Sequence, residues 1–238
     1  MGKKFELTDK FIINVFGIKL FQIKCTKSFK YAQKGDLGGY VEKEGNLDQE
    51  NDAWVYGDAQ VYGDAQVYGD ARVSGNAQVY GDARVSGDAQ VYGNAWVSGN
   101  AQVYGDAGVS GNAQVYGDAR VSGNAQVSGD AWVYGNAQVS GDAQVSGDAR
   151  VSGDAQVYGN ANIKNNNEHC GFDGFGSCNR HTHAYLTKEK KVEITCGCFR
   201  GSIEEFEKKV EETHSGTIYE KQYKAIINVI KIKFGLTD

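Results

Sequence analysis

Valine recurs at every sixth position across residues 55–157, and Ile163 continues the same register. The repeating unit is V-[YS]-G-[DN]-A-x, and it occurs eighteen times in succession across residues 55–162. A period of six matches neither the roughly 3.6-residue repeat of an α-helix nor a sustained two-residue alternation, but it suits a short strand followed by a tight corner. We therefore expect Val and the small Ala to point inward and the neighbours of Val to point outward. The Gly and the Asp or Asn after it are expected to form the corner, because they tolerate positive φ.

This repeat resembles the hexapeptide-repeat, left-handed parallel β-helix family, whose loose motif is [LIV]-[GAED]-x-x-[STAV]-x. Every Val and every Ala of residues 55–162 is in phase with that motif. The resemblance implies a left-handed, triangular β-helix in which three hexads make one turn. Eighteen hexads then predict about six turns of 18 residues. At a strand spacing of ~4.8 Å, the rod would be roughly 29 Å long.

The flanks lack the regular hexads and predict a cap at each end of a mainly β fold. We expect an N-terminal β cap with irregular entry coils over residues 1–52, the β-helix over residues 53–163, and a C-terminal α+β domain over residues 164–238. A solenoid exposes unpaired backbone at both ends, which would promote aggregation unless terminal segments cover it. The two flanks are the segments that could do so.

Each flank also predicts its own elements. Residues 5–25 predict two strands around a turn at Phe16 and Gly17. After the last hexad, residues 182–187 and 192–199 predict a hairpin, and Ser202 with Glu205 predicts a capping box that opens an amphipathic helix ending at Gly216. A second, more apolar helix is expected at about residues 219–234.

Parts of the flanks are similar to hexapeptide-repeat proteins encoded by bacteriophages and prophages. The resemblance rests on the entry segment 35–47, on Cys196-Gly197-Cys198-Phe199-Arg200-Gly201, and on the downstream Glu204–Glu207 and Thr213-His214. Together with the repeats between these segments, the resemblance covers nearly the whole chain. Because such proteins are generally of unassigned function, the resemblance implies a phage context more than an activity.

The outward positions differ between the three predicted faces, because residues 18 apart stack vertically. One face gathers aromatic side chains at half of its twelve outward positions: Tyr62, Tyr80, Trp96, Tyr116, Trp132 and Tyr134. Tyr and Trp are enriched at interfaces, and members of the resembled family commonly trimerise along their rods. We therefore predict a homo-oligomer, a trimer or a dimer, through this face. The alternative is that Tyr is simply a good strand residue that stacks on itself.

Charge and composition exclude several classes of partner. The repeats hold four arginines and eleven aspartates without any Lys or Glu, which gives them a formal charge of −7 within a chain of −5. Such an acidic rod argues against binding duplex nucleic acid. No apolar run approaches the roughly 20 residues that a bilayer requires, so we expect no membrane partner and a cytoplasmic location, in the host cell if the chain is phage-encoded. The five cysteines, none of them in the repeats, indicate reduced thiols.

Candidate binding chemistry is confined to the C-terminal domain, which holds all four histidines and four of the five cysteines. These residues could suggest a zinc site, but Cys170-x7-Cys178, His181-x-His183 and Cys196-x-Cys198 differ from the usual zinc spacings, so we predict no metal and no cofactor. The glycine-rich segment 171–180 suggests instead a loop that binds an anion or a nucleotide phosphate. Its candidate ligand-binding residues are Gly174, Gly176, Ser177, Arg180 and His181. The alternative is a flexible hairpin connection.

The repeats offer no catalytic residues of the kinds that the resembled family uses. Hexapeptide-repeat acyltransferases act through a His on a coil, and the related carbonic anhydrases need a His triad for their metal, yet residues 55–162 contain no His. We therefore expect a non-enzymatic binding or scaffold protein of phage type, acting as an accessory or counter-defence factor on a host component or a small anionic ligand. The alternatives are a virion structural or assembly component and a degenerate acyltransferase.

Overall fold

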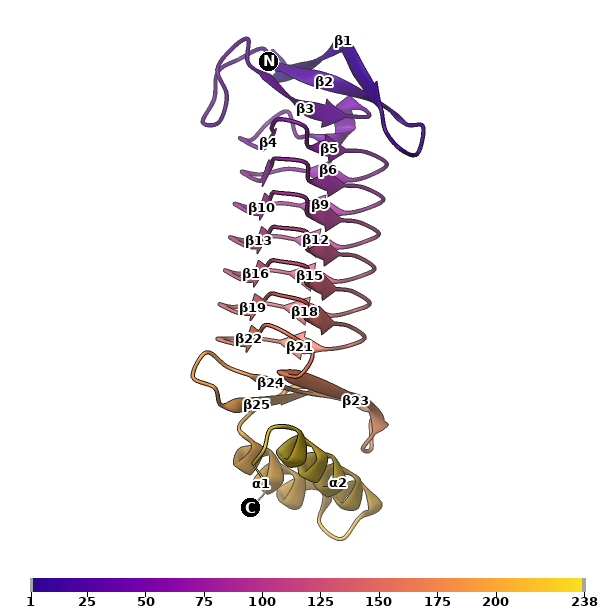
Figure 1. Ribbon diagram of the computed structural model, residues 1–238, viewed down its shortest axis with the longest axis vertical. Helices are drawn as coiled ribbons and strands as arrows, with labels where there is room; N and C mark the ends of the chain where they lie inside the picture. The colour runs from indigo at the N-terminus through magenta and orange to yellow at the C-terminus, as the bar shows by residue number, and fades with distance from the viewer. Residues whose placement is uncertain (1, 237–238) are drawn as a thin grey trace.

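The computed structural model describes residues 2–236, and it shows a rod with a different cap at each end (Figure 1). A β-hairpin covers the N-terminal end, a stack of coils forms the shaft, and a four-stranded sheet with two helices covers the C-terminal end. The mainly β class and the two predicted caps are confirmed. Residues 1, 237 and 238 of the predicted caps lie outside the described residues.

The shaft consists of two-residue strands that each join the variable position x to the following Val. The first two are β4 (Trp54–Val55) and β5 (Gln60–Val61), and the others follow at six-residue intervals: β6 (Gln66–Val67), β7 (Arg72–Val73), β8 (Gln78–Val79), β9 (Arg84–Val85), β10 (Gln90–Val91), β11 (Trp96–Val97), β12 (Gln102–Val103), β13 (Gly108–Val109), β14 (Gln114–Val115), β15 (Arg120–Val121), β16 (Gln126–Val127), β17 (Trp132–Val133), β18 (Gln138–Val139), β19 (Gln144–Val145), β20 (Arg150–Val151), β21 (Gln156–Val157) and β22 (Asn162–Ile163).

Strands 18 residues apart pair in parallel, so that Val97 lies between Val79 and Val115. This pairing builds three sheets along the shaft: β4 to β22 with seven strands, β6 to β21 with six, and a nine-stranded sheet that continues from β20 through β5 into β3, β2 and β1. The predicted parallel β-helix is confirmed as a parallel β-solenoid. Its left-handedness stays a prediction from the resemblance.

The solenoid has seven turns, one more than the regular hexads predict. Strand β3 (Leu37–Val41) pairs in parallel with β5, placing Val41 beside Val61, and Leu47 bridges Val67 in the same way. Val41, Leu47 and Val55 therefore make an additional first coil. This coil belongs to the predicted irregular entry coils, and its irregularity is the step of eight positions, instead of six, from Leu47 to Val55.

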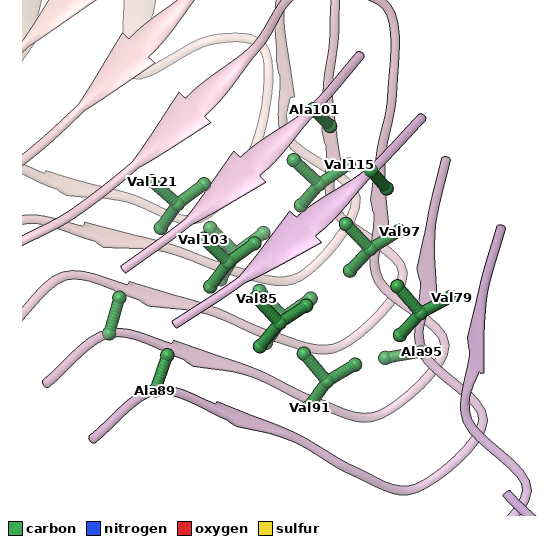
Figure 2. Close-up of a cluster of buried hydrophobic side chains, with 14 of the residues drawn as sticks. Val79, Val85, Ala89, Val91, Ala95, Val97, Ala101, Val103, Val115 and Val121 are labelled. Carbon is green, nitrogen blue, oxygen red and sulfur yellow. The ribbon is translucent and has the colours of Figure 1, made fainter. Parts of the chain in front are cut away.

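Within the eighteen hexads, the inward Val and Ala form the core of the shaft, and these side chains are buried throughout. Figure 2 shows Val79, Val85 and Val91, from three successive faces, converging with alanines such as Ala95. Because a single coil cannot bury these side chains without the coils above and below it, stacking supplies the hydrophobic stabilisation.

Glycine alone provides the positive φ of each corner, at all eighteen positions from Gly57 to Gly159. The Asp or Asn that follows has a negative φ, which corrects the expectation that both residues share this role. Several of these side chains instead link neighbouring coils, as in the series from Asn76 to Asn94, Asn112 and Asp130, with N–O distances of 3.1, 3.1 and 2.8 Å. At the step from Asn112 to Asp130, an amide beside a carboxylate avoids two adjacent like charges.

The N-terminal cap is the predicted hairpin of β1 (Phe5–Ile13) and β2 (Lys19–Cys25), which turns at Gly17 with a φ of +77°. Phe5, Ile23 and Cys25 close the top of the Val core. Lys4 is buried, and its Nζ donates hydrogen bonds to the carbonyl oxygens of Asn51 at 2.5 Å and Ala53 at 2.9 Å. Burial lowers the pKa of Lys4 to about 8.

A short 3₁₀ helix, η1 (Glu44–Asn46), completes the same cap. The Asn46 side chain donates to the carbonyl oxygens of Gly63 at 3.0 Å and Ala65 at 2.9 Å. Lys4 and Asn46 thus provide donors to carbonyls that face the cap, where a further coil would otherwise supply them.

The C-terminal cap is a four-stranded antiparallel sheet backed by two helices. Its elements are β23 (His169–Phe175), β24 (Arg180–Leu186), β25 (Val192–Cys196), β26 (Phe199–Gly201), α1 (Ile203–His214) and α2 (Ile218–Lys233). The hairpin of β24 and β25, the two helices and the capping box are confirmed; Ser202 Oγ accepts from the Glu205 N–H at 3.2 Å.

Two strands of this cap were not predicted. Residues 171–175 lie in β23, so the glycine-rich segment is a loop only after Phe175. Residues 192–199 are not one strand either, because Gly197 turns the chain with a φ of +59° and Phe199 opens β26.

Candidate functional site

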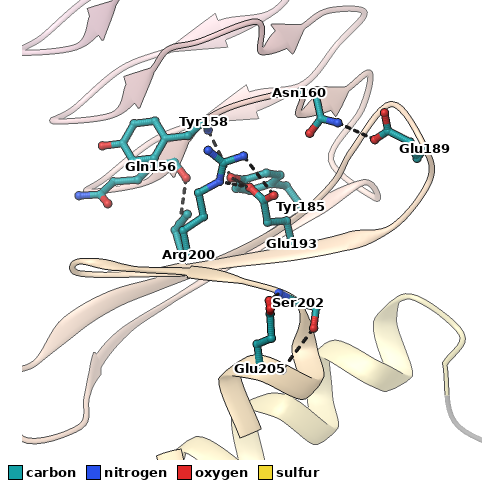
Figure 3. A network of polar contacts seen from close by, with 10 residues as sticks. Gln156, Tyr158, Asn160, Tyr185, Glu189, Glu193, Arg200, Ser202 and Glu205 are labelled. Atoms are coloured by element: carbon teal, nitrogen blue, oxygen red, sulfur yellow. Dashed lines mark hydrogen bonds and ion pairs between the residues drawn. The ribbon is translucent and has the colours of Figure 1, made fainter. Parts of the chain in front are cut away.

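The solenoid and the C-terminal cap meet along one face of the cap sheet. Side chains alternate along β24, so Ala184 packs with the helices while Tyr185 enters the solenoid core. Tyr185 is fully buried, and its hydroxyl donates to Glu193 Oε1 at 2.6 Å and accepts from the Tyr158 N–H at 3.3 Å (Figure 3). Burial and the hydrogen bond to Glu193 hold the pKa of Tyr185 above its usual value. Tyr185 is thus the central contact of the junction.

The cap supplies acceptors to backbone donors of the last coil. Along the shaft, the N–H groups on either side of each Val donate to carbonyls of the following coil, as Tyr134 does to Val151 at 3.0 Å. In the last coil, Arg150 N–H donates instead to Asn166 Oδ1 at 2.9 Å, and Lys164 N–H to Glu168 Oε2 at 2.8 Å. Together with the Tyr158 N–H, three N–H groups at the end of the ladder are therefore satisfied by side chains of the cap.

A cleft of about 180 Å³ remains between the last coil and the cap sheet, and we name it the histidine cleft. Arg150, Ser152, Gly153 and Ala155 line its solenoid wall. His169, Gly171, Asp173, His181 and His183 line its cap wall. The histidines lie on the same face of the cap sheet as Tyr185. Residues 181, 183 and 185 are every second residue of β24 and so share one side of it, and His169 of β23 lies directly opposite Tyr185.

The ring nitrogens of these histidines form two short chains of contacts. His183 Nε2 lies 3.0 Å from His169 Nδ1, and His169 Nε2 lies 3.4 Å from Asn166 Oδ1. Separately, His181 Nδ1 lies 2.5 Å from Asp173 Oδ1. Burial, reinforced by the neighbouring His169 and His181 rings, lowers the pKa of His183 to about 3, and burial with the nearby Lys233 lowers the pKa of His169 to about 4. The two rings are therefore neutral at pH 7.

We predict that this neutrality makes the fold sensitive to acid. An unfolded His titrates near pH ~6.5, so between about pH 6.5 and 4 the unfolded chain binds protons that the folded His169 and His183 do not. The free energy of unfolding therefore falls with falling pH, by on the order of 2 kcal/mol at pH 5 for the fully buried His183 ring. Thermal unfolding from pH 7 to pH 5 should show a shallower pH slope for His183→Leu than for the wild type. His214→Gln, outside the cleft, should keep the wild-type slope, and equal slopes in all three proteins would contradict the prediction.

The residues predicted to form an anion loop do not come together at one site. Arg180 and His181 are successive residues of β24 and face opposite sides of the sheet, with the Arg180 side chain lying against Gly197. Gly176 N–H donates to Gln222 Oε1 at 2.9 Å, and the Tyr223 hydroxyl fills the space beside Gly176. Gly174 and Ser177 are exposed at the far end of the hairpin. Only His181 of this set lines the histidine cleft.

Among residues 2–236, no group of three or more His, Cys, Asp or Glu side chains is placed to hold a metal ion. Across the same residues, no helix is both long and apolar enough to cross a membrane.

The predicted aromatic residues lie on the outward face of β3, β5, β8, β11, β14, β17 and β20, which we name the aromatic face. Tyr62 stacks on Tyr80, and Tyr116 on Tyr134, in each pair with ring centroids 5.0 Å apart. Trp96 is 42% exposed, which makes it the most accessible of the six predicted residues.

One of the six aromatic residues is covered. Tyr62 is only 3% exposed, because it packs with Leu20 and Tyr40 beneath the N-terminal hairpin, whose Phe16 ring lies 6.4 Å from it. The hairpin tip in turn exposes Val15 and Phe16 next to this face. The sequence does not predict that Tyr62 is covered or that Val15 and Phe16 are exposed beside the aromatic face, because it does not show which way the hairpin folds.

The comparisons with known proteins concern the repeats. Seven segments match the family model described as YdcK Beta solenoid repeat: 59–75, 65–79, 77–91, 89–105, 113–129, 125–141 and 143–159. No curated protein matches the chain. Together with the seven stacked coils, these matches show that residues 59–159 form a β-solenoid of hexapeptide-repeat type, similar to the YdcK repeats.

Proposed function

We propose that this chain is a non-enzymatic binding or scaffold protein that self-associates through the aromatic face. The observation that carries the proposal is the composition of this face. In the eighteen hexads, Arg150 is its only charged outward residue, whereas Trp96, Trp132 and Tyr134 present aromatic rings along it. Uncharged surfaces rich in Trp and Tyr are typical of interface cores.

The geometry of the rod favours a second copy of the chain as the partner. Side-chain ridges on the face repeat at the strand spacing of ~4.8 Å, and a copy of the same rod has grooves at the same spacing. Contact between faces leaves the acidic corners in solvent, so their mutual repulsion does not prevent association. Such rods pair about a two-fold or three-fold axis, as closed symmetric oligomers do.

The remaining parts of the proposal rest on the sequence. The hexads contain no His, Cys, Glu or Lys, which favours a role in binding over catalysis. A phage-type accessory role on a host component rests on the resemblance of the flanks, and copurification from the host would test it. Self-association is the part that the geometry supports best.

Trp96→Glu is expected to dissociate the oligomer, because it places a charge at the centre of the apolar face. We expect at least ~10-fold weaker association, equivalent to about 1.4 kcal/mol, in light scattering coupled to size-exclusion chromatography. Tyr104→Glu is the matched control, since Tyr104 is 40% exposed, similar to Trp96, but lies on the sheet of β6 to β21.

Salt provides a second test of the same contact. Because each repeat region carries a formal charge of −7, raising NaCl from 50 to 500 mM should screen repulsion and strengthen self-association. Two results would overturn the proposal. One is a wild-type protein that is monomeric at both salt concentrations, and the other is dissociation of the oligomer by Tyr104→Glu as strong as that by Trp96→Glu.

A further inference from the structure

The protons on the histidines of the histidine cleft can be assigned from their neighbours. Asn166 Oδ1 accepts the Arg150 N–H, which identifies this atom as the amide oxygen, so His169 Nε2 must carry the hydrogen that points to it. His169 Nδ1 is then unprotonated and accepts a hydrogen from His183 Nε2 at 3.0 Å. This assignment leaves His183 Nδ1 without a hydrogen, in a ring that also interacts with the backbone of Gln156.

The second chain of contacts gives the same outcome for His181. The Asp173 carboxylate accepts from His181 Nδ1, so His181 Nε2 is also a bare lone pair in the neutral ring. Both bare nitrogens are buried, and neither has a hydrogen-bond partner within residues 2–236. His183 is 1% exposed, so its unpartnered acceptor is fully inside the molecule. Buried polar atoms without a partner are uncommon and indicate a site for something else.

The solenoid wall of the cleft carries the opposite kind of group. In the preceding coils of this sheet, the residue after Val donates its N–H to a carbonyl of the next coil, as Ser98 does to Val115 at 2.9 Å. The equivalent N–H of Ser152 has no acceptor among the described residues, because the cap sheet replaces the next coil. The Ser152 hydroxyl adds a further donor to this wall, whereas the Arg150 guanidinium lies over the Trp132 ring of the preceding coil, 4.6 Å from its centroid.

The cleft thus holds donors on one wall and proton-accepting nitrogens on the other. An oxyanion accepts hydrogen bonds from the first wall, while a proton on the second wall turns a bare nitrogen into another donor. A volume of about 180 Å³ equals that of on the order of six water molecules, enough for a small tetrahedral anion. A cation would instead meet the Ser152 N–H.

We propose that the histidine cleft binds a small tetrahedral oxyanion of the phosphate class together with one proton, which is held on Nε2 of His181. Asp173 favours this location, because its carboxylate stabilises the charged His181 ring from the opposite nitrogen. His183 is less suited, since it lies between two other histidines. The charged and titratable groups around the ring are Arg150, Asp173, His169, His183 and, beyond His169, Lys233.

Gly171 supports the assigned position of His181. A Cβ at this position would lie 2.6 Å from His181 Cε1 and 2.8 Å from Nε2, so the imidazole occupies the space above a residue without a side chain. The absence of a side chain at Gly171 of β23 therefore provides the space for the His181 ring. All residues of the proposed site belong to one chain, so the inference does not depend on self-association.

Isothermal titration calorimetry of the intact chain with sodium phosphate and with sodium sulfate tests the proposal. Repeating the titration at pH 6 in two buffers of different ionisation enthalpy measures the protons taken up. We expect uptake of about one proton with sulfate, and an affinity for sulfate that falls about tenfold per pH unit over the range in which one proton is taken up with the anion. An adenosine monophosphate titration distinguishes the sources: binding at least ~10-fold tighter than free phosphate indicates a nucleotide phosphate, and equal binding indicates the free ion.

His181→Gln should abolish proton uptake and weaken sulfate binding at least ~10-fold. Gly171→Ala, which is compatible with the strand, should weaken it as well by displacing the ring. His214→Gln is the control and should bind like the wild type, because His214 lies at the end of α1, stacked on Tyr223. Thermal melts verify that each variant is folded.

Three results would overturn the proposal. These are an absence of binding of both anions at millimolar concentration, binding without proton uptake, and unchanged binding in His181→Gln. A melting temperature that rises with zinc chloride but not with phosphate would point to a cation site instead. The Trp96→Glu variant should bind anions normally, which separates this test from that of self-association.

Discussion

Tyr185→Ala is expected to lower the free energy of unfolding by about 3–5 kcal/mol, the usual cost of removing a large buried aromatic side chain. Tyr185 is fully buried and belongs to the same cluster as the Val core, although it comes from the cap. Its removal leaves a cavity beneath the last coil, and it also leaves Glu193 and the Tyr158 N–H without the hydroxyl that joins them. Chemical denaturation followed by circular dichroism measures this loss.

Tyr185→Phe separates the ring from the hydroxyl. Phe keeps the packing and removes only the two hydrogen bonds, so we expect a smaller loss of about 1–3 kcal/mol. The Ala variant should also aggregate more readily, because the uncovered last coil offers unpaired donors to other chains. Equal stability of the Ala variant and the wild type would show that the cap is not held by this side chain.

Gly111→Ala is expected to cost about 2–5 kcal/mol, because two effects add. A left-handed φ, here +68°, costs an L-residue roughly 1–2 kcal/mol. A Cβ at Gly111 would also lie 2.9 Å from the backbone N of Gly129 in the next coil, and such overpacking costs about 1–3 kcal/mol.

Gly153→Ala isolates the conformational part of that cost. Gly153 has a similar φ of +63°, but a Cβ there meets nothing within 4 Å, so only about 1–2 kcal/mol is expected. Thermal unfolding of the two variants in parallel measures the difference. An equal loss in both would mean that the close stacking of glycines contributes nothing to the requirement for glycine at these corners.

The shaft could be predicted from the sequence because one local rule recurs at every hexad. A six-residue period fixes which residues face the core, and the stacking of identical units fixes the rest. The rule fails where the period changes. Before the first hexad the sequence predicts only irregular entry coils, because Leu47 and Val55 are eight positions apart, although Val41 and Leu47 face the same core.

The histidine cleft could be predicted only in part. The alternation of His181, His183 and Tyr185 places three rings on one side of a strand, and a sequence can show that much. It cannot show that His169 lies on the adjacent strand, or that the solenoid ends opposite this face with an unpaired N–H. These depend on how β23 pairs and how the cap docks. The glycines that suggested a loop instead make room for neighbouring side chains, as Gly171 does for His181.

The unlike chemistry of the two caps has a consequence for how the chain can change its length. Lys4 and Asn46 contact only the first coils, and Asn166, Glu168 and Tyr185 contact only the last. Inserting or deleting three hexads therefore alters neither joint and shifts one cap along the axis by ~4.8 Å without rotating it. A change of one hexad would instead rotate the histidine cleft by a third of a turn relative to the N-terminal hairpin. The rod is thus a spacer of adjustable length, in which whole turns set distance and single hexads set direction.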